Sequence, residues 1–389
     1  MRVHWIVSAE LLLSIAGAVT YYYWPQSLQR PEAPVPQVIS TDTGHTSISW
    51  PGRVFVAKVG DFDDVLPAYL MFDYIRSHGP LQGRQVLLTS AGLSSHARYS
   101  IWVQLPDDVL TGVEESAVLK QNPLLSVGEE SWITADQYAR DLFETNSFVQ
   151  AYNSPDFPTL TEIPPEALRR YVQQFICFKA SVDPRTWPGN SFPLSRPSPE
   201  RAEDLAADIV ELASFYGIPV DVLLGIGAME NNFLNAPGDL NNAIWKNDVE
   251  RDDIVLRRRG RKAWVLNSSI GTWQITRQSL RHAHELFLCD TRDYSRLPLE
   301  FRPTQELDMN FLSSRLLTTY AALLLRELLD YFDGNAFLAT AAYNGTKLRP
   351  NLNYASGVEN VASYARRVIG NTSILKDTID RKSASTAER

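Results

Sequence analysis

Five prolines crowded between Asp183 and Pro199 prevent this chain from continuing as one run of helix or strand. They are Pro184, Pro188, Pro193, Pro197 and Pro199. Because proline fixes its own φ angle and has no amide hydrogen to donate, neither a helix nor a central strand passes through such a stretch. The break predicts a domain boundary, with one region at 51–195 and another at 196–375.

The region at 51–195 alternates short runs of β-forming residues with stretches of helical character. The runs Val54–Val56, Val86–Leu88 and Ile101–Val103 combine β-branched, aromatic and leucine side chains, a pattern that favours strands. We therefore predict a small mixed α/β region here. It contains no residue pattern that indicates a particular chemistry, so the sequence assigns it no function.

The region at 196–375 has the residue pattern of helices. Ser198 can cap a helix whose first turn contains Pro199, and apolar residues then recur on one face until Gly217 ends the helix. Further helices are predicted from Pro219, over Met309–Leu324 and over Phe337–Tyr343. We predict an all-α domain here and a frayed polar tail at 376–389, so that the overall fold class is α+β.

Residues 1–24 contain an apolar stretch, from Trp5 to Val19, followed by the aromatic cluster Tyr21–Trp24. Its short apolar centre and the small residues Ala16–Ala18 favour a cleaved export signal. The aromatic cluster, and a length near the roughly 20 residues of a membrane span, favour an uncleaved hydrophobic helix as membrane anchor. Both alternatives place the rest of the chain outside the cytoplasm, in the periplasm or at the outer face of the cytoplasmic membrane. The proline-rich residues 25–50 are predicted to form a linker.

The overall composition gives no general attraction to polyanions. With 37 basic and 45 acidic residues the net charge is -8, so we expect no nucleic-acid partner. The two cysteines, Cys177 and Cys289, lack the spacing of a metal or redox motif, and their apolar neighbours predict buried core residues. The sequence contains no motif for a metal or a cofactor.

Glu230 is the first residue that indicates a chemistry. It follows the apolar run Gly225–Met229 and precedes Phe233 by three positions, so we expect desolvation to raise its pKa. A carboxylic acid that is neutral near pH 7 can protonate a glycosidic oxygen. A glutamate at a helix end is also typical of a solvated or capping residue, so this position alone does not identify a site.

Three short segments in a fixed order add to that indication. They are Met229–Phe233, Gly271–Ile275 and Ala341–Gly345, with the sequences Met-Glu-Asn-Asn-Phe, Gly-Thr-Trp-Gln-Ile and Ala-Ala-Tyr-Asn-Gly. Together they resemble the lytic transglycosylase domain of the soluble lytic transglycosylase type, a peptidoglycan-cleaving family with a lysozyme-like helical fold. The resemblance covers roughly Ser198 to Ile374, a little under half of the chain.

The resemblance implies a role for five residues. Glu230 matches the sole catalytic acid and base of the family, and Gln274 matches its substrate-facing glutamine. Trp273 is expected to stack on a sugar, with a core position as the alternative. Tyr343 matches a tyrosine that positions the catalytic glutamate, and Asn344 matches an asparagine that contacts the glycan or supports the site.

The resemblance also implies the reaction and its partner. Glycan strands of peptidoglycan would be cut between N-acetylmuramic acid and N-acetylglucosamine without water, leaving 1,6-anhydro ends, in cell wall remodelling. The substrate's acetamido oxygen would replace a second carboxylate, and no cofactor would be needed. Two alternatives stay open: a hydrolytic muramidase, with Asp239, Asp248, Asp252 or Asp253 supplying the second acid, and a catalytically weak peptidoglycan-binding or assembly protein.

Some residues depart from the family pattern. Asn231 stands where the family usually has serine, which predicts a reshaped groove. Residues 239–266 form an insertion, and its basic run Arg257–Lys262 is either a solvated loop or a site for anionic wall peptides or lipid head groups. The acid expected four residues before Tyr364 falls on Asn360, one position from Glu359.

Overall fold

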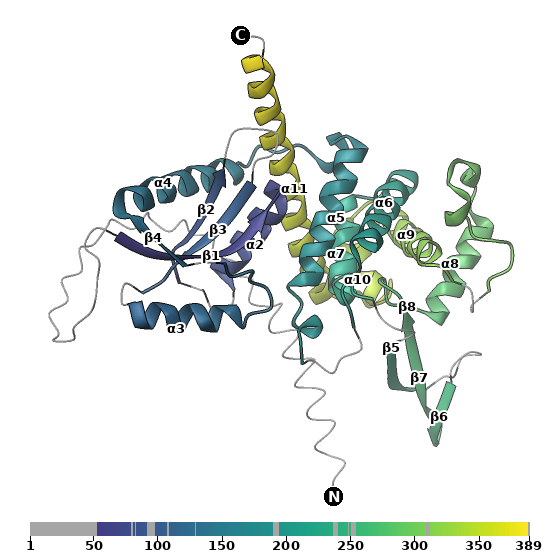
Figure 1. Ribbon diagram of the computed structural model, residues 1–389. Coiled ribbons are helices and arrows are strands. Elements are labelled where there is room, and N and C mark those ends of the chain that lie inside the picture. Colours follow the sequence, from purple (N-terminus) through teal and green to yellow (C-terminus); the bar gives the residue numbers. More distant parts are fainter. Residues whose placement is uncertain are drawn as a thin grey trace, which may run out of the picture. The chain divides into compact units, whose positions relative to one another are not determined.

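The computed structural model describes residues 53–78, 81, 83–91, 98–106, 109–128, 130–189, 194–235, 240–247, 249, 254–308 and 312–387 (Figure 1). The predicted anchor at 1–24 and linker at 25–50 lie outside the described residues. None of the described helices is long and apolar enough to cross a membrane. The described residues form a mixed α/β structure, in agreement with the predicted class at this coarse level.

A four-stranded antiparallel sheet forms the first part of the described chain. Its strands lie in the order β2 (Val86–Ala91), β3 (Arg98–Gln104), β1 (Arg53–Phe62) and β4 (Glu130–Thr134). The three predicted β-rich runs lie in β1, β2 and β3, which confirms them. Figure 1 shows helices α3 (Val109–Lys120) and α4 (Ala135–Tyr152) on opposite faces of this sheet.

Alternation along the strands supplies both faces of the sheet with apolar side chains. In β1, the Phe55 ring lies so close to Gly112 of α3 that a Cβ added there would come within 2.7 Å of it. The next residue, Val56, lies on the face toward α4. Helix α2 (Val65–Ser77) contributes Tyr69, whose ring stacks on that of Tyr152 in α4 with centroids 3.6 Å apart.

The remaining longer helices lie on both sides of the predicted break, α5 before it and the others after it. They are α5 (Pro165–Ser181), α6 (Pro199–Tyr216), α7 (Val220–Asn231), α8 (Arg277–Cys289), α9 (Ser314–Tyr331), α10 (Ala336–Asn344) and α11 (Leu352–Ala387). The start of α6 is as predicted, because Ser198 Oγ accepts a hydrogen bond from Arg201 N at 3.2 Å. Its end is also confirmed, since Gly217 has φ +63° and caps it in the left-handed conformation.

One hydrophobic core joins the sheet to the helices. It extends without interruption from Phe55 in β1 to Ile369 in α11. Tyr152 Oη donates to Val368 O at 2.7 Å, and Tyr364 Oη donates to Asp73 Oδ2 at 3.0 Å. The boundary predicted at residue 195 therefore does not coincide with a gap in the core, and residues 48–389 form one compact unit.

The prediction of an all-α domain after residue 196 is wrong in one segment. The insertion at 239–266, for which no strands were predicted, contains β5 (Leu240–Lys246), β6 (Ile254–Arg259) and most of β7 (Lys262–Ile270). These strands pair antiparallel in the order β5-β7-β6, and the short β8 (Ile275–Thr276) adds to β7. The neighbouring pairs Ile244–Trp245, Ile254–Val255 and Trp264–Val265 favour strands here, a signal that the charge run obscures.

Two further expectations are corrected by the structure. Helix α11 continues to Ala387, so the backbone of residues 376–387 is helical where a frayed tail was predicted. Its packed N-terminal part provides the nucleus from which such a helix extends. Both cysteines are free thiols, and Cys289 is exposed although its neighbours predicted burial, whereas Cys177 packs against the core.

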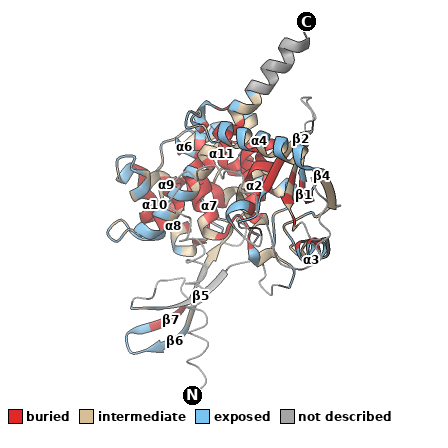
Figure 2. Ribbon diagram, turned by 90° about the vertical axis from the view of Figure 1, so that its left-hand side faces the viewer, coloured by how far each residue is buried: buried red, intermediate tan, exposed pale blue. Residues whose placement is uncertain are grey.

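Helix α7 is almost entirely buried and packs along α11 (Figure 2). Gly225 of α7 lies against the backbone of α11, where an added Cβ would come within 2.6 Å of Val358 O. Gly357 of α11 lies in turn against Met229 of α7, whose Cε would be 2.6 Å from an added Cβ. The absence of side chains at these two glycines sets how closely the helices approach.

We predict that Gly225→Ala lowers the free energy of unfolding by about 1–3 kcal/mol, because the backbone carbonyl of Val358 cannot move aside. Gly357→Ala is the matched control: the flexible end of Met229 can shift, and alanine favours helix by about 1 kcal/mol over glycine. Urea denaturation followed by circular dichroism measures both. Equal effects of the two substitutions would contradict this account of the interface.

Candidate functional site

Glu230 lies in the last turn of α7, at the edge of the core. Two residues with left-handed backbone follow the helix, Asn232 with φ 55° and Phe233 with φ 61°. They turn the chain back so that the Phe233 ring fills the space beside Gly227, where an added Cβ would lie 2.4 Å from it. The helix therefore ends directly after the glutamate, which stays partly buried.

The carboxylate of Glu230 accepts a short hydrogen bond from Tyr354, near the start of α11. Tyr354 Oη lies 2.6 Å from Glu230 Oε1. Burial raises the pKa of Glu230 from 4.5 to about 7, and the hydrogen bonds from Tyr354 and Asn344 lower it only in part. A substantial fraction of this side chain is therefore protonated near pH 7, in agreement with the expectation from its apolar neighbours.

A second hydroxyl near Glu230 belongs to Tyr343 in α10. Its Oη is buried and has no hydrogen-bond partner among the described residues. Burial, followed by the charge of Glu230, raises the pKa of Tyr343. A buried hydroxyl without a partner is uncommon in folded proteins, so the described contacts leave this group unexplained. The hydrogen bond to Glu230 comes from Tyr354, and the positioning role expected of Tyr343 stays a prediction.

Asn344 follows at the C-terminal end of α10 and is exposed. Its Oδ1 accepts a hydrogen bond from Asn351 Nδ2 at 2.8 Å, and its amide helps to lower the pKa of Glu230. Asn351 Oδ1 also accepts from Tyr354 N at 3.1 Å, at the start of α11. The predicted Asn344 thus belongs to the same network as Glu230 and Tyr354.

The turn after β7 is connected to the end of α7 through Asn231. Asn231 Nδ2 donates to Gly271 O at 3.5 Å. Gln274, with φ 45°, donates from Nε2 to the same carbonyl at 2.7 Å and accepts from Ser269 Oγ at 2.6 Å. No hydrogen bond joins Gln274 to Glu230 among the described residues, so the substrate-facing role of Gln274 stays a prediction.

Two residues expected in the groove lie in the core instead. Trp273 is only 1% exposed, and its Nε1 donates to Thr318 Oγ1 of α9 at 2.9 Å. An indole without an accessible face cannot stack on a sugar, so the predicted substrate contact of Trp273 is wrong. Asn231 is also 1% exposed. Its side chain binds the turn after β7 to the end of α7, whereas a reshaped groove was expected at this position.

Tyr354 is the site residue that the sequence analysis missed. It lies outside the three recognised segments, but the apolar periodicity of α11 contains a signal for it. Tyr354, Val358, Ala362 and Ala365 follow one another at helical spacing and are all buried. A tyrosine at the first position of such a stripe is a candidate for a buried hydroxyl, because its ring packs in the core while its oxygen needs a partner.

Within the described residues, no charged group acts on the pKa of Glu230, which burial and hydrogen bonds alone determine. The aspartates considered as second acids, Asp239, Asp248, Asp252 and Asp253, lie outside the described residues. Glu359 pairs with Arg366 at 3.8 Å, and nearly half of its side chain is exposed. The site as described therefore has one carboxyl group and two hydroxyl groups.

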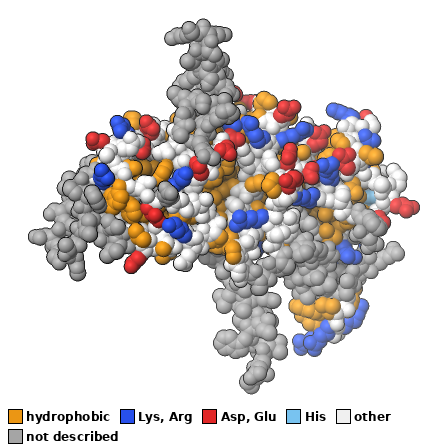
Figure 3. All heavy atoms as spheres, viewed as in Figure 1, with side chains coloured by type: hydrophobic (Ala, Val, Ile, Leu, Met, Phe, Trp, Pro, Cys, Tyr) orange, Lys and Arg blue, Asp and Glu red, His pale blue; other side chains and the backbone are white. Residues whose placement is uncertain are grey.

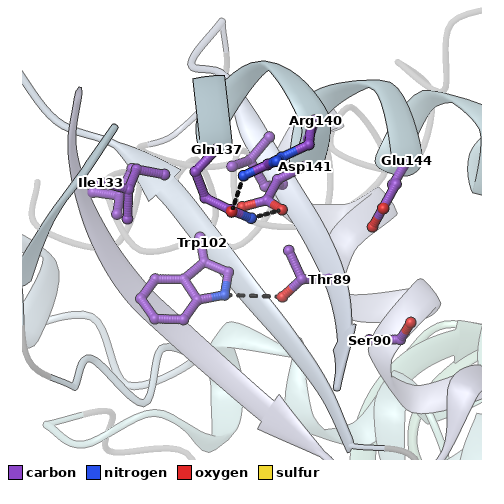
Figure 4. Close-up of a pocket in the computed structure, with 10 residues that line it drawn as sticks. Thr89, Ser90, Trp102, Ile133, Gln137, Arg140, Asp141 and Glu144 are labelled. Atoms are coloured by element: carbon purple, nitrogen blue, oxygen red, sulfur yellow. Dashed lines mark hydrogen bonds between the residues drawn. The ribbon is translucent and has the colours of Figure 1, made fainter. Parts of the chain in front are cut away.

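A separate pocket of about 450 Å³ lies between the first sheet and α4 (Figure 4). Trp102 Nε1 donates to Thr89 Oγ1 at 3.1 Å across two strands. On α4, Gln137 donates to Asp141 at 2.6 Å and accepts from Arg140 at 2.8 Å. These polar groups bond one another, and among the described residues no hydrogen bond joins a hydroxyl of the pocket to one of its carboxylates, so the pocket assigns no chemistry to residues 51–195.

Comparison of this chain with protein-family models, with curated proteins and with solved structures gives no match.

We predict that Glu230→Gln stabilises the protein at high pH. The native pKa of about 7 exceeds the ordinary 4.5, so the folded state holds a proton that the unfolded state releases, and stability falls as pH rises through this interval. Glutamine does not titrate, so the variant keeps the free energy of unfolding, about 2–3 kcal/mol, that the wild-type protein loses above pH 7. Denaturation of both proteins at about pH 4.5 and pH 8 measures it; a pH-independent difference would contradict the raised pKa.

We predict that Tyr354→Phe raises the pKa of Glu230 further, because the lost hydrogen bond stabilises the carboxylate. Tyr343→Phe is the control and shifts it less, since that hydroxyl makes no hydrogen bond. Carbon-13 NMR of glutamate-labelled protein, with Glu230→Gln to assign the resonance, follows the titration. Equal shifts in the two variants would refute the positioning role of Tyr354.

Proposed function

We propose that this chain is a peptidoglycan lytic transglycosylase whose residues 196–375 form a lysozyme-like catalytic domain. One observation carries the proposal: Glu230 ends a buried helix as a carboxyl with pKa about 7, bonded to Tyr354 and close to the partnerless Tyr343 hydroxyl. A group of this kind can both give and accept a proton near neutral pH. The order of the segments around Glu230, Gln274 and Asn344 indicates the family.

In the proposed first step, Glu230 protonates the glycosidic oxygen between N-acetylmuramic acid and N-acetylglucosamine. The bond to the anomeric carbon of the muramic acid breaks, and its electron pair stays with the departing oxygen. The acetamido oxygen of the same sugar stabilises the positive anomeric carbon, so a second carboxylate is not required.

In the second step, Glu230 acts as the base. Its carboxylate, held by the Tyr354 hydroxyl, takes the proton from the 6-hydroxyl of the muramic acid. The oxygen attacks the anomeric carbon and closes the 1,6-anhydro ring, which restores the protonated glutamic acid. A nucleophile tethered within the substrate outcompetes water because its effective concentration is high.

The N-terminal residues bear on where this reaction would occur. An export signal or membrane anchor at 1–24 is consistent with a substrate outside the cytoplasm, and we propose the periplasm or the outer face of the cytoplasmic membrane. The role is then cell wall remodelling on glycan strands. Residues 51–195 share a core with the catalytic part, and no chemistry is proposed for them.

We predict that Glu230→Gln abolishes the release of 1,6-anhydro-muropeptides from peptidoglycan sacculi, by at least about 100-fold, because the amide cannot donate and recover the proton. Glu203→Gln, the same change at an exposed position of α6, is the control and keeps wild-type turnover. Mass spectrometry of the released muropeptides measures both. Sedimentation with sacculi shows whether the inactive variant still binds.

The products also separate the alternatives. Anhydro ends support the transglycosylase, whereas reducing ends, about one water heavier, identify a hydrolytic muramidase. Binding to sacculi without release by the wild-type protein identifies a wall-binding protein. Unchanged turnover in Glu230→Gln would remove Glu230 from the reaction.

A further inference from the structure

The sheet formed by β5, β6 and β7 carries tryptophan and basic residues on one face. Trp245 of β5 pairs with Trp264 of β7, and Trp264 pairs on its other side with Arg257 of β6. Two positions further toward the turn, Arg259 pairs with Lys262. Since residues two apart share a face of a strand, these five side chains form one surface, here called the hairpin face.

The hairpin face is exposed to solvent although it is partly apolar. Trp245 is 43% exposed, and Leu256, at the bulge beside Arg257, is 53% exposed. The two indole rings lie 5.3 Å apart at a tilt of 56° and pack on each other. Figure 3 shows hydrophobic and basic side chains next to one another over this part of the protein. Exposed apolar side chains that cluster together are a feature of interaction surfaces.

The charge of this segment differs in sign from that of the whole chain. Residues 254–265 contain four arginines and one lysine, all exposed, and no acidic residue. Including the connection that precedes them, residues 246–262 hold seven basic and four acidic side chains, a net charge of +3 in a chain of net charge -8. An anionic surface would therefore attract this end and repel the rest, which orients the protein.

On the opposite face of the same sheet, the central strand β7 is covered. Ala263 and Val265, which alternate with Lys262 and Trp264 along β7, are both fully buried. That face adds one exposed cation, Arg258, which pairs with Ala263, whereas the exposed indole of Trp245 lies on the hairpin face. In Figure 2 the sheet projects away from the helices, so a flat partner can approach it.

We propose that the hairpin face docks on the surface of a membrane that contains anionic lipids. Tryptophan is enriched at the level of lipid head groups, and arginine and lysine bind their phosphates. An exposed leucine beside them can enter the boundary with the acyl chains. This inference is independent of the reaction proposed for Glu230.

Docking on a membrane accounts for more of the exposed side chains of this surface than binding to a soluble polyanion does. A glycan or nucleic acid would use the cations, and it can stack on tryptophan, but it has no use for the aliphatic side chain of Leu256. A bilayer accommodates all three kinds of side chain at once. The contribution of Leu256 therefore separates the two partners.

The test measures binding of the full chain to vesicles of phosphatidylcholine alone and of phosphatidylcholine with phosphatidylglycerol. One variant neutralises three cations of the hairpin face, Arg257→Gln, Arg259→Gln and Lys262→Gln. Its control, Arg140→Gln, Arg170→Gln and Arg296→Gln, removes the same charge from exposed positions on other elements. The predicted N-terminal anchor is common to all the proteins, so the difference between the two vesicles reports the hairpin.

A second pair of variants tests the apolar contribution. Trp245→Ser with Leu256→Ser alters the hairpin, whereas Leu299→Ser with Leu348→Ser removes two other exposed leucines, 77% and 89% exposed. Far-ultraviolet circular dichroism of the contacting Trp245–Trp264 pair shows whether the charge variant keeps its hairpin.

We expect the hairpin charge variant to bind anionic vesicles roughly 100-fold more weakly than wild type, about fivefold for each charge, with the control unchanged. The hairpin apolar variant is expected to lose at least tenfold, and its control nothing. Equal binding by the hairpin charge variant and wild type would overturn the proposal. So would unchanged binding by the apolar variant together with release of the protein from vesicles by dextran sulfate, which would indicate a general polyanion site.

Discussion

The close contact between α7 and α11 is the constraint on which the candidate site depends. Gly225 lets the two helices approach until a Cβ would touch the carbonyl of Val358, one turn along α11 from Tyr354. At this separation the tyrosine hydroxyl reaches the carboxylate of Glu230 at 2.6 Å. A wider spacing would leave the acid without its donor, and the left-handed residues after Glu230 keep the helix from extending past this point.

Burial without a neighbouring charge then determines the chemistry of Glu230. Asp208 in α6 shows that a raised pKa alone does not identify a site, since burial also raises its pKa to about 7 while Arg315 lies 3.3 Å away. Asp208 is completely buried, so it cannot reach a substrate. Glu230 differs because it lies at a helix end, is partly accessible, and adjoins a hydroxyl that has no partner of its own.

The second sheet begins and ends beside this site. β5 follows the loop after α7, and β7 leads into the turn that Asn231 binds through Gly271 O. The hairpin that carries the basic and aromatic face is therefore attached at both ends to the residues around Glu230. In the proposed arrangement, docking of that face would hold the end of α7 at a defined height above a membrane, with the substrate glycan beside it.

Local patterns in the sequence were sufficient for much of the fold and for part of the site. Capping and periodicity located α6 and α10, and the β-rich runs located three strands. The apolar run before Glu230 indicated the raised pKa of its carboxyl group. These properties depend mainly on residues that are neighbours in the sequence. Sequence patterns alone did not reveal the burial of Trp273, the strands of the insertion or the role of Tyr354. Burial and hydrogen-bond partners depend on segments far apart in the chain: Tyr354 and Glu230 are separated by 124 residues, and only the packing of two helices brings their oxygens together.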